Sequence, residues 1–258
     1  GLKMHRVDGI NFDYGMFTNI SNDHIGPNEH ADFAEYLYWK CQLLKKCRVA
    51  IVNRDDEHFE EICRNAERKV FTYSLEQDAD FMAKDIHYVA EPDFVGLDFD
   101  VTGQYELNVK VNIPGRFNVY NALAATCVAE QLGLSMDEIK CGIAAASTIS
   151  GRTNLIHTKG MTVIDDCYNA NPMSMKASLD VLAQADGRKI AVLGDMGELG
   201  ENECEMHYEV GKYAANQGVD VLFCCGTLSE ELAKGAQRGH TQVMYFKTLD
   251  KMMLALVP

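Results

Sequence analysis

Short apolar runs alternate with helix-length segments along most of this chain of 258 residues. Residues 48–53 (RVAIVN) form a continuous apolar run of the kind found in parallel sheets that are covered on both faces. The same pattern recurs later, where the runs at 189–193 and 219–224 are separated by a helix-like segment over 203–215. Because alternating strands and helices build βαβ units, we expect an α/β fold with a doubly wound sheet.

Periodicity and turn signals place the remaining elements. Strands are expected at 17–20, 153–158, 161–165 and 242–246, a hairpin at 94–99 and 105–111, and helices at 30–46, 118–132, 136–146 and 229–236, with two more beginning at Asp55-Asp56 and at Pro172. The pattern changes near Ser150-Gly151-Arg152. We therefore expect one domain over residues 1–149 and a second over 150–258.

Composition excludes several classes of protein. The 24 Lys+Arg against 38 Asp+Glu give a net charge of −14, which disfavours a nucleic-acid-binding surface because phosphate binding needs clustered cations. No apolar run approaches the roughly 18 residues of a membrane span, and no signal-peptide pattern is visible, so membrane insertion is not expected. Nine cysteines without a Cys-x-x-Cys pair predict reduced thiols in a cytosolic protein.

A polar cluster at residues 18–24 (TNISNDH) follows the first predicted strand. Ligands bind at the carboxyl ends of strands in α/β sheets, and His24 has a neutral imidazole nitrogen suited to a metal ion. A surface histidine beside a helix cap is the alternative interpretation. Lys40 lies on the following helix, and its ammonium cannot ligate Mg²⁺, so taken alone it is a solvent-exposed residue.

Two further segments carry amides or carboxylates after a strand or at a helix start. Asn53 and Asp56 follow the apolar run at 48–53 and fit either a helix cap or a nucleotide contact. Asn118 and Asn121 are three residues apart, hence on one face of the predicted helix. An amide donates and accepts hydrogen bonds at once, which matches an adenine edge, while a cap with a buried amide is the alternative.

Residues 5–40 (HRVDGINFDYGMFTNISNDHIGPNEHADFAEYLYWK) resemble the central ATPase domain of the Mur ligases. They are most similar to the MurE type, which adds the third amino acid to a UDP-N-acetylmuramoyl peptide. The resemblance implies that His24 binds Mg²⁺ and that Lys40 is carbamylated, becoming an oxygen ligand of the type Mg²⁺ prefers. It also implies that Arg6 contacts the nucleotide-sugar substrate. Met4 departs from the family pattern, in which Gln often stands there.

The same resemblance extends to the nucleotide and implies a set of ATP contacts. The residues are Asn53 and Asp56 near the nucleotide, Asn118 and Asn121 at the adenine pocket, Arg152 at the phosphates, and Asp166 at the ribose, with Asp165 as the neighbouring alternative. A guanidinium for phosphate and a carboxylate for ribose hydroxyls are the expected chemical types. The central segment is therefore interpreted as part of a P-loop-type ATPase domain.

Residues 165–182 (DDCYNANPMSMKASLDVL) and 189–207 (KIAVLGDMGELGENECEMH) instead resemble the MurF type, which adds D-alanyl-D-alanine. This part of the resemblance implies a Rossmann-like C-terminal ligase domain and a set of candidate substrate contacts, with turn and cap roles left open: Tyr168, Asn169, Asn171, Ser174, Asp195, Glu198 and His207. The Asp-Asn-Pro-Arg signature of many third-residue ligases is absent. The chain thus combines features of two subtypes.

The family's phosphate loop, of the Gly-x-x-Gly-Lys-Thr/Ser type, does not occur in the sequence. The family glutamate that joins the matching His and Lys around Mg²⁺ normally precedes the position of Gly1, and a further strand usually follows residues 254–258. The resemblance therefore implies that these residues are the middle and most of the C-terminal part of a longer ligase.

The expected function of the parent is ATP-dependent addition of D-alanyl-D-alanine to a UDP-N-acetylmuramoyl peptide through an acyl phosphate, in the bacterial cytoplasm. ATP and Mg²⁺ are the expected cofactors. Addition of the third amino acid is the first alternative, and a non-catalytic binding module is the second. The L-G-D-M-x-E-L-G segment argues against a folate-type or polymer-forming amide ligase on the same scaffold.

The missing phosphate loop yields a first prediction. The 258-residue polypeptide is expected to show no ATPase activity, because the loop N–H groups and lysine that hold the β- and γ-phosphates are absent from it. Phosphate release from ATP measures this directly. Sustained turnover above a no-protein blank would contradict the prediction.

Overall fold

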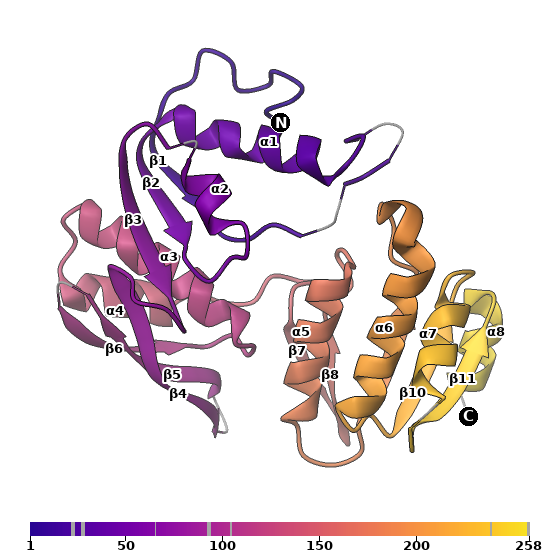
Figure 1. Ribbon diagram of the computed structural model, residues 1–258. Helices are drawn as coiled ribbons and strands as arrows, with labels where there is room; N and C mark the ends of the chain where they lie inside the picture. Colours follow the sequence, from indigo (N-terminus) through magenta and orange to yellow (C-terminus); the bar gives the residue numbers. More distant parts are fainter. Residues whose placement is uncertain are drawn as a thin grey trace. The chain divides into compact units, whose positions relative to one another are not determined.

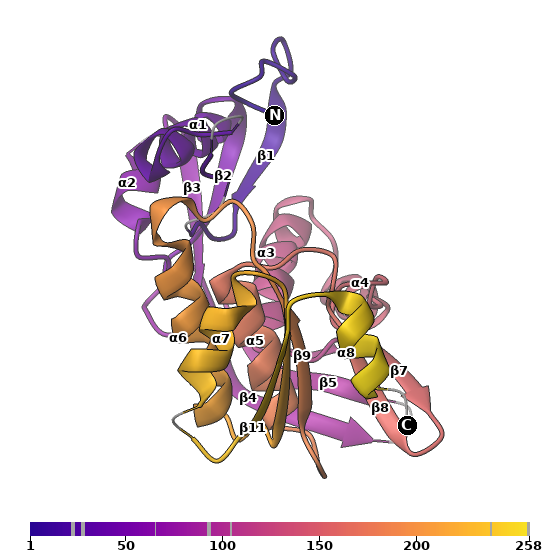
Figure 2. The same ribbon diagram turned by 90° about the vertical axis from the view of Figure 1, so that its right-hand side faces the viewer.

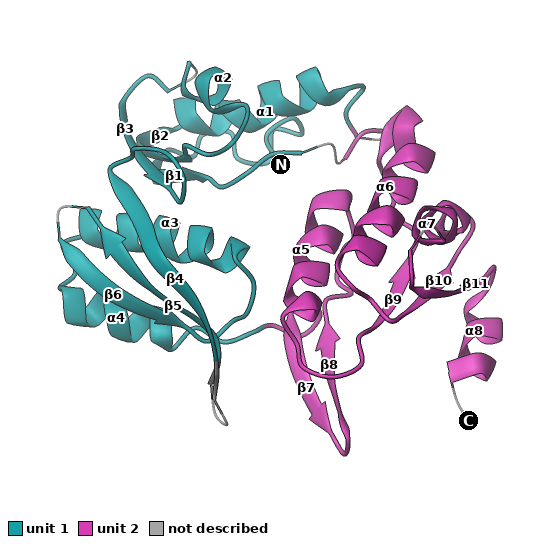
Figure 3. Ribbon diagram, turned by 60° about the horizontal axis from the view of Figure 1, so that its bottom comes forward, with its two compact units in different colours: residues 1–21, 30–148 teal, residues 22–29, 149–258 magenta. Residues whose placement is uncertain are grey.

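The computed structural model describes residues 1–21, 24–26, 29–64, 66–91, 94–103, 105–237 and 239–256. Asn22 and Asp23 of the predicted polar cluster, and Gln104 of the predicted hairpin, lie outside the described residues. The chain divides into two compact units (Figure 3), residues 1–21 with 30–148 and residues 22–29 with 149–258. The segment 22–29 therefore groups with the second unit, although it is flanked in the sequence by the first.

The first unit is built on one six-stranded sheet (Figure 1). Its strands, in both spatial and sequence order, are β1 (Phe12–Phe17), β2 (Cys47–Asn53), β3 (Lys69–Ser74), β4 (Phe81–Glu91), β5 (Phe94–Thr102) and β6 (Glu106–Val111). Strands β1 to β4 pair in parallel, whereas β4, β5 and β6 pair antiparallel. The sheet therefore has a parallel part, β1 to β4, that continues into an antiparallel meander, β4 to β6.

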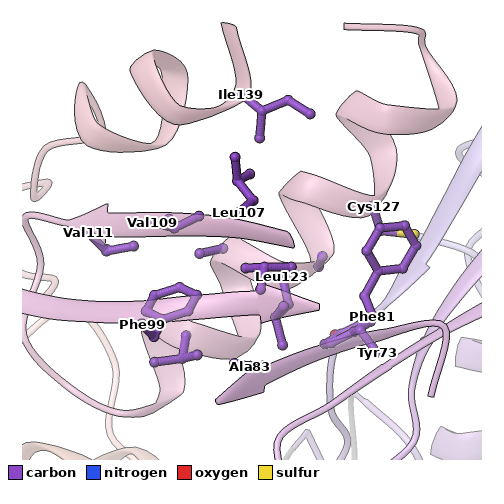
Figure 4. Packing of buried hydrophobic residues seen from close by; sticks show 14 of the residues in the cluster. Tyr73, Phe81, Ala83, Phe99, Leu107, Val109, Val111, Leu123, Cys127 and Ile139 are labelled. Atoms are coloured by element: carbon purple, nitrogen blue, oxygen red, sulfur yellow. The ribbon is translucent and has the colours of Figure 1, made fainter. Parts of the chain in front are cut away.

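Helices cover both faces of this sheet, which explains the continuous apolar run of β2. Ala50 and Val52 belong to a buried cluster with α1 (Phe33–Lys45) and α2 (Phe59–Cys63). Ile51 points to the opposite cluster, formed with α3 (Phe117–Gln131) and α4 (Met136–Ala144). Figure 4 shows this second cluster, in which Leu123 and Phe99 are fully buried. Successive residues of a strand point to opposite faces, so both must be apolar here.

The second unit contains a hairpin and a separate parallel sheet. The hairpin pairs β7 (Asn154–Thr158) with β8 (Met161–Asp165), and the sheet has the order β11 (Gln242–Phe246), β10 (Val221–Cys225), β9 (Ile190–Gly194). The helices are α5 (Pro172–Ala183), α6 (Glu203–Asn216), α7 (Ser229–Ala236) and α8 (Leu249–Leu256), with one 3₁₀ turn at Gly200–Asn202.

Helices also cover both faces of the β9–β11 sheet (Figure 2). On β10, Leu222 and Cys224 pack into the cluster formed with α5, α6 and α7. Val221 and Phe223 pack on the other face with Met252 of α8. The predicted α/β fold with a doubly wound second sheet is confirmed. Among the described residues, no helix is long and apolar enough to cross a membrane.

Several predicted elements lie elsewhere in the structure. Phe17 and Ile20 are buried as expected, but the strand lies earlier than predicted: β1 spans Phe12–Phe17, is the edge strand beside β2, and alternates in exposure along its length. The helix expected to begin at Asp55-Asp56 begins at Phe59. The strands expected at 153–158 and 161–165 are confirmed as β7 and β8, which pair with each other as a hairpin. Strands β3 and β4 and helix α8 were not predicted.

Close helix packing in the second unit yields a second prediction. A Cβ atom on Gly211 of α6 would lie under 3.0 Å from the Leu232 carbonyl of α7, and one on Gly235 would meet the Tyr208 carbonyl equally closely. We expect Gly211→Ala to lower the free energy of unfolding by about 2–3 kcal/mol, because the helices must separate. Urea denaturation followed by circular dichroism measures the change.

Gly142→Ala is the matched control, since Gly142 of α4 has nothing within 4 Å of a built Cβ. This control is expected to raise the free energy of unfolding by about 0.5–1 kcal/mol through helix propensity. Equal behaviour of the two variants would show that α6 and α7 tolerate a methyl group at their contact.

Candidate functional site

In the first unit, two of the predicted nucleotide residues hold a loop in place at the carboxyl end of β2. The amide nitrogen of Asn53 donates to the Thr18 carbonyl at 3.1 Å, and its oxygen accepts from the Asp55 N–H at 3.0 Å. The carboxylate of Asp56 accepts from the Ile20 N–H at 3.0 Å. Both residues therefore fasten the segment that follows β1 to the end of β2.

Asp55, which was not among the candidate site residues, makes the more extensive contacts. It accepts from the Ser74 hydroxyl at 2.6 Å, from the Leu75 N–H at 2.7 Å and from the Tyr120 hydroxyl at 3.0 Å. Burial, followed by the charge of Asp55, raises the pKa of Tyr120. Asp55 thus joins the ends of β2 and β3 to α3. The residues that bond to Asp55 lie 19, 20 and 65 positions away in the sequence, so no short motif predicts these contacts.

The two predicted amides of α3 meet each other. Asn121 donates to the Asn118 side-chain oxygen at 3.1 Å, and Asn118 donates to the Pro114 carbonyl at 2.8 Å. Asn118 is buried and Asn121 is exposed. Both line a cavity of about 310 Å³ whose other walls are mainly apolar residues of β6, α3 and α4. The arrangement offers a polar edge within an apolar wall, which suits a flat heterocycle.

Lys40 and Arg6 are both exposed residues of the first unit. Lys40 lies on α1 with its Nζ 5.1 Å from the ring centroid of Tyr36, a cation–π distance. Arg6 lies in the turns that precede β1, where its N–H donates to the Gly1 carbonyl at 3.2 Å. An ammonium repels a metal ion, so Lys40 fits a metal site only in the carbamylated form.

In the second unit, two adjacent carboxylates at the end of β8, Asp165 and Asp166, hold one short loop. Asp165 accepts from the Gly151 N–H at 3.0 Å, and Asp166 accepts from the Thr153 N–H at 2.9 Å. Asp166 also accepts from the Ser178 hydroxyl of α5. A hydrogen bond with the Cys167 thiol, followed by the one from Gly151, holds the pKa of Asp165 below its usual value. The loop 151–153 is therefore held at both ends.

Arg152, at the centre of this loop, is exposed together with Tyr168. Its guanidinium lies 4.3 Å from the ring centroid of Tyr168, and the Tyr168 N–H donates to the Gly151 carbonyl at 3.1 Å. The side chain of Tyr168 is 71 % exposed. The structure thus brings two predicted site residues together as a flat cationic and aromatic surface.

The asparagines of the YNANP segment differ in their roles. Asn171 is the N-cap of α5, accepting from the Ser174 N–H at 2.8 Å, while the Ser174 hydroxyl accepts from the Asn171 N–H at 3.1 Å. This reciprocal pair is a capping box. Asn169 is exposed in the turn before the helix. Asn171 therefore has the helix-cap role, which was one of the two roles left open by the sequence, whereas Asn169 is exposed to solvent.

Asp195, directly after β9, organises the loop that follows β10. It accepts from the Thr227 N–H at 2.8 Å and from the Ser229 N–H and hydroxyl at 2.7 and 2.6 Å. Burial raises the pKa of Asp195, but the hydrogen bonds outweigh this effect and leave the pKa below its ordinary 3.8. A Cβ on Gly226 would collide with this carboxylate, so only glycine fits beside it.

His207 of α6 is fully buried, with both ring nitrogens bonded. Its Nε2 accepts from the Met196 N–H at 2.9 Å, and its Nδ1 lies 2.6 Å from the Glu203 carbonyl, which assigns the proton to Nδ1. His207 therefore positions the loop after β9.

His24 and Glu198 also meet. His24 Nδ1 lies 3.0 Å from a carboxylate oxygen of Glu198, and the Ile25 N–H donates to the Glu198 carbonyl at 3.2 Å. With Glu29 they present one imidazole nitrogen and two carboxylates within 4.8 Å of one another. This donor set is chemically compatible with a divalent cation.

Two family models cover most of the chain. The Mur ligase middle domain matches residues 1–129, and the Mur ligase glutamate ligase domain matches residues 151–257. The chain belongs to the Mur ligase family. In this Mur ligase chain, the match to the glutamate ligase domain begins at residue 151, in the loop that carries Arg152.

Relatives of more than one Mur subtype are similar to the chain. It is 35 % identical over 200 residues to the UDP-N-acetylmuramoyl-L-alanyl-D-glutamate–L-lysine ligase of Streptococcus pneumoniae, covering 77 % of this chain and 40 % of that protein. It is 32 % identical over 216 residues to the UDP-N-acetylmuramoyl-tripeptide–D-alanyl-D-alanine ligase of Haemophilus influenzae, covering 83 % and 45 %.

The fold is similar to that of a solved Mur ligase. The crystal structure of MurF from Acinetobacter baumannii aligns with a TM-score of 0.83 at 29 % identity, over 95 % of this chain and 52 % of that one. The chain thus spans about half the length of that protein, and less than half of each curated relative above.

Asp195 yields a third prediction, on the pH dependence of stability. Because its pKa is lower in the folded state, its contribution is complete above pH 3.8 and is lost as the pH falls through the folded-state pKa. Asp195→Asn is expected to cost about 0.5–1.5 kcal/mol near neutral pH, because the residue is exposed and water screens its contacts. The difference from wild type should shrink below pH 3.8, measured by urea denaturation at several pH values. Asp186→Asn, at an exposed loop position, is the control. A difference that stays constant with pH would contradict the assignment.

Proposed function

We propose that the complete Mur ligase containing this chain uses ATP to join D-alanyl-D-alanine to a UDP-N-acetylmuramoyl peptide. Family membership supports amide ligation of peptidoglycan precursors. The MurF-type segments of the second unit, the Haemophilus relative and the MurF-like fold support the dipeptide as the amine. The observation that carries the proposal is the Arg152–Tyr168 surface, held between two carboxylate-bound loop ends at the start of the glutamate ligase domain match.

The proposed reaction has two steps. A carboxylate oxygen of the peptide attacks the γ-phosphorus of ATP, ADP leaves, and an acyl phosphate forms. The amine nitrogen of the dipeptide then attacks the acyl carbon, loses a proton and displaces inorganic phosphate. A divalent cation, when bound, supplies charge neutralisation at the phosphates. The protein's own task is to hold the reacting groups together and to complement developing charge.

We assign the nucleotide to residues from both domain matches. Asn118 and Asn121 would bind adenine at their cavity, and Asn53 and Asp56 would lie near the nucleotide. Arg152 would bind phosphate with its exposed guanidinium. Asp166 would bind a ribose hydroxyl; a carboxylate offers about four acceptor sites, and the hydrogen bonds from Thr153 and Ser178 use two of them.

The remaining predicted residues are assigned metal-binding, substrate-binding or positioning roles. His24 would ligate Mg²⁺ together with carbamylated Lys40, and Glu198 lies beside His24. Arg6 would contact the nucleotide sugar. The exposed Asn169 and Tyr168 are proposed to touch the amine substrate directly. The engaged residues Asn171, Asp195 and His207 are proposed to position the loops around it.

Addition of a single third amino acid is the second candidate. Residues 5–40 resemble the MurE type, and the Streptococcus relative is named as an L-lysine ligase. An assay of the complete enzyme distinguishes the two candidate functions. The enzyme is given ATP, either the UDP-N-acetylmuramoyl dipeptide or the tripeptide, and one amine: L-lysine, diaminopimelate or D-alanyl-D-alanine. Product mass is the readout. A product formed from the tripeptide and D-alanyl-D-alanine supports the first candidate, and a product formed only with a single amino acid overturns it.

We also propose that the protein works in the bacterial cytoplasm. All nine cysteines are free thiols, and Cys41, Cys47, Cys127 and Cys224 are buried. Burial raises the pKa of Cys41 to about 11 and that of Cys224 to about 12, so these thiols stay protonated. Reduced, unpaired thiols are typical of a reducing compartment.

Arg152 yields the fourth prediction. In the complete enzyme, Arg152→Ala is expected to raise KM for ATP by about 10–100-fold, because a charge-assisted hydrogen bond to phosphate is lost. Initial-rate kinetics with varied ATP measures this. Arg188→Ala, at an exposed loop position of the same unit, is the control and should leave KM unchanged. An unchanged KM in Arg152→Ala would remove Arg152 from the nucleotide site.

A further inference from the structure

Tyr120 lies next to Asn121 on α3, but its side chain does not line the cavity of the paired amides. Its ring packs into the buried cluster of the first unit, with its centroid 6.5 Å from that of the fully buried Tyr73 of β3. Its hydroxyl donates to the Asp55 carboxylate at 3.0 Å. Because burial, followed by the charge of Asp55, raises the pKa of Tyr120, the phenol keeps its proton and remains the donor.

The Asp55 carboxylate is held in place independently of Tyr120. It accepts from the Ser74 hydroxyl at 2.6 Å and from the Leu75 N–H at 2.7 Å, both at the carboxyl end of β3. The Asp55 N–H donates to the side chain of Asn53 at the end of β2. Hydrogen bonds to a charged acceptor are the stronger kind. The ends of β2 and β3 therefore set the position of the acceptor that the Tyr120 hydroxyl must reach.

The first turn of α3 has weak restraints of its own. In the part of the chain that the structure describes, Arg116 at the N-cap makes no capping hydrogen bond with its side chain. Its guanidinium lies 3.7 Å from the Glu76 carboxylate, but both side chains are more than half exposed, so water weakens this pair. Val119 is fully buried, but apolar contacts are not directional. The hydrogen bond between Tyr120 and Asp55 is the directional contact that orients this turn relative to the sheet.

We propose that the Tyr120–Asp55 hydrogen bond orients the amides of Asn118 and Asn121 for binding adenine. This role rests on the proposed nucleotide site, in which the two amides meet the base. Asn121 follows Tyr120 directly, and its amide donates to the Asn118 side chain at 3.1 Å, so a rotation of the turn moves both amides together. Tyr120 and Asp55 are thus positioning residues, and neither touches the nucleotide.

Base selectivity is the property that separates positioning from general stability. Inosine triphosphate has the ribose and phosphates of ATP, but it carries a carbonyl oxygen where adenine has its amino group. Amides held in one orientation discriminate between the two bases, whereas loosely held amides can turn to suit either one. In the complete enzyme, Tyr120→Phe is expected to raise KM for ATP about 3–10-fold with kcat within about twofold of wild type. The preference for ATP over inosine triphosphate should fall about threefold or more.

Tyr14→Phe is the matched control. Tyr14 is also half-buried, and its hydroxyl donates at 3.1 Å to the carbonyl of Gln131, the last residue of α3. The same atom is removed from a contact with the other end of the same helix, so KM and the base preference should stay at their wild-type values. When Asp55→Asn is already present, Tyr120→Phe should change KM by less than about twofold, because the two changes remove one shared contact.

Asn121→Ala tests the proposed nucleotide site by itself. A raised KM for ATP in Asn121→Ala, with KM and base preference unchanged in Tyr120→Phe, would overturn the positioning role and leave the nucleotide site in place. An unchanged KM in both variants would overturn both assignments. Equal effects of Tyr14→Phe and Tyr120→Phe would show a general dependence on the stability of α3, which also overturns the positioning role. The comparison of Tyr120→Phe with Tyr14→Phe decides even if Asp55→Asn folds poorly.

Discussion

Carboxylates that accept backbone N–H groups at the carboxyl ends of strands hold the functional loops of both units. Asp55 and Asp56 do so after β2, and Asp195 does so after β9. Asp165 and Asp166 fix the loop that presents Arg152. A charged acceptor makes stronger hydrogen bonds than a neutral one, so short loops without regular structure acquire a fixed geometry. The exposed groups proposed to touch ligands depend on these hydrogen bonds.

The residues proposed to contact ligands therefore differ from the residues that hold the loops in position. Arg152, Tyr168 and Asn169 are exposed. His207 and Asn171 were chosen from the same motifs, but their polar atoms are bonded within the protein. A motif that is specific for a family therefore identifies a whole loop, and the hydrogen bonds that each side chain already makes decide which of its residues can contact a substrate.

The sequence predicted the elements whose signal is local. Buried strands such as β2 and β10 are continuous apolar runs, and α7 and β11 match their predicted ranges. The edge strand β1 was misplaced because its exposed face breaks the apolar run. Asp56 was preferred to Asp55 because the partners of Asp55 come from β3 and α3, which only the folded chain brings near. The His24–Glu198 contact has the same long-range origin.

We propose that the complete Mur ligase containing this chain activates a peptide carboxylate as an acyl phosphate. The most direct test supplies the complete enzyme with ATP, the amine and a UDP-N-acetylmuramoyl peptide in which both oxygens of the reacting carboxylate are ¹⁸O. We expect each inorganic phosphate released to receive one ¹⁸O atom from the carboxylate, as measured by mass spectrometry. Amide product formed with unlabelled phosphate would contradict it.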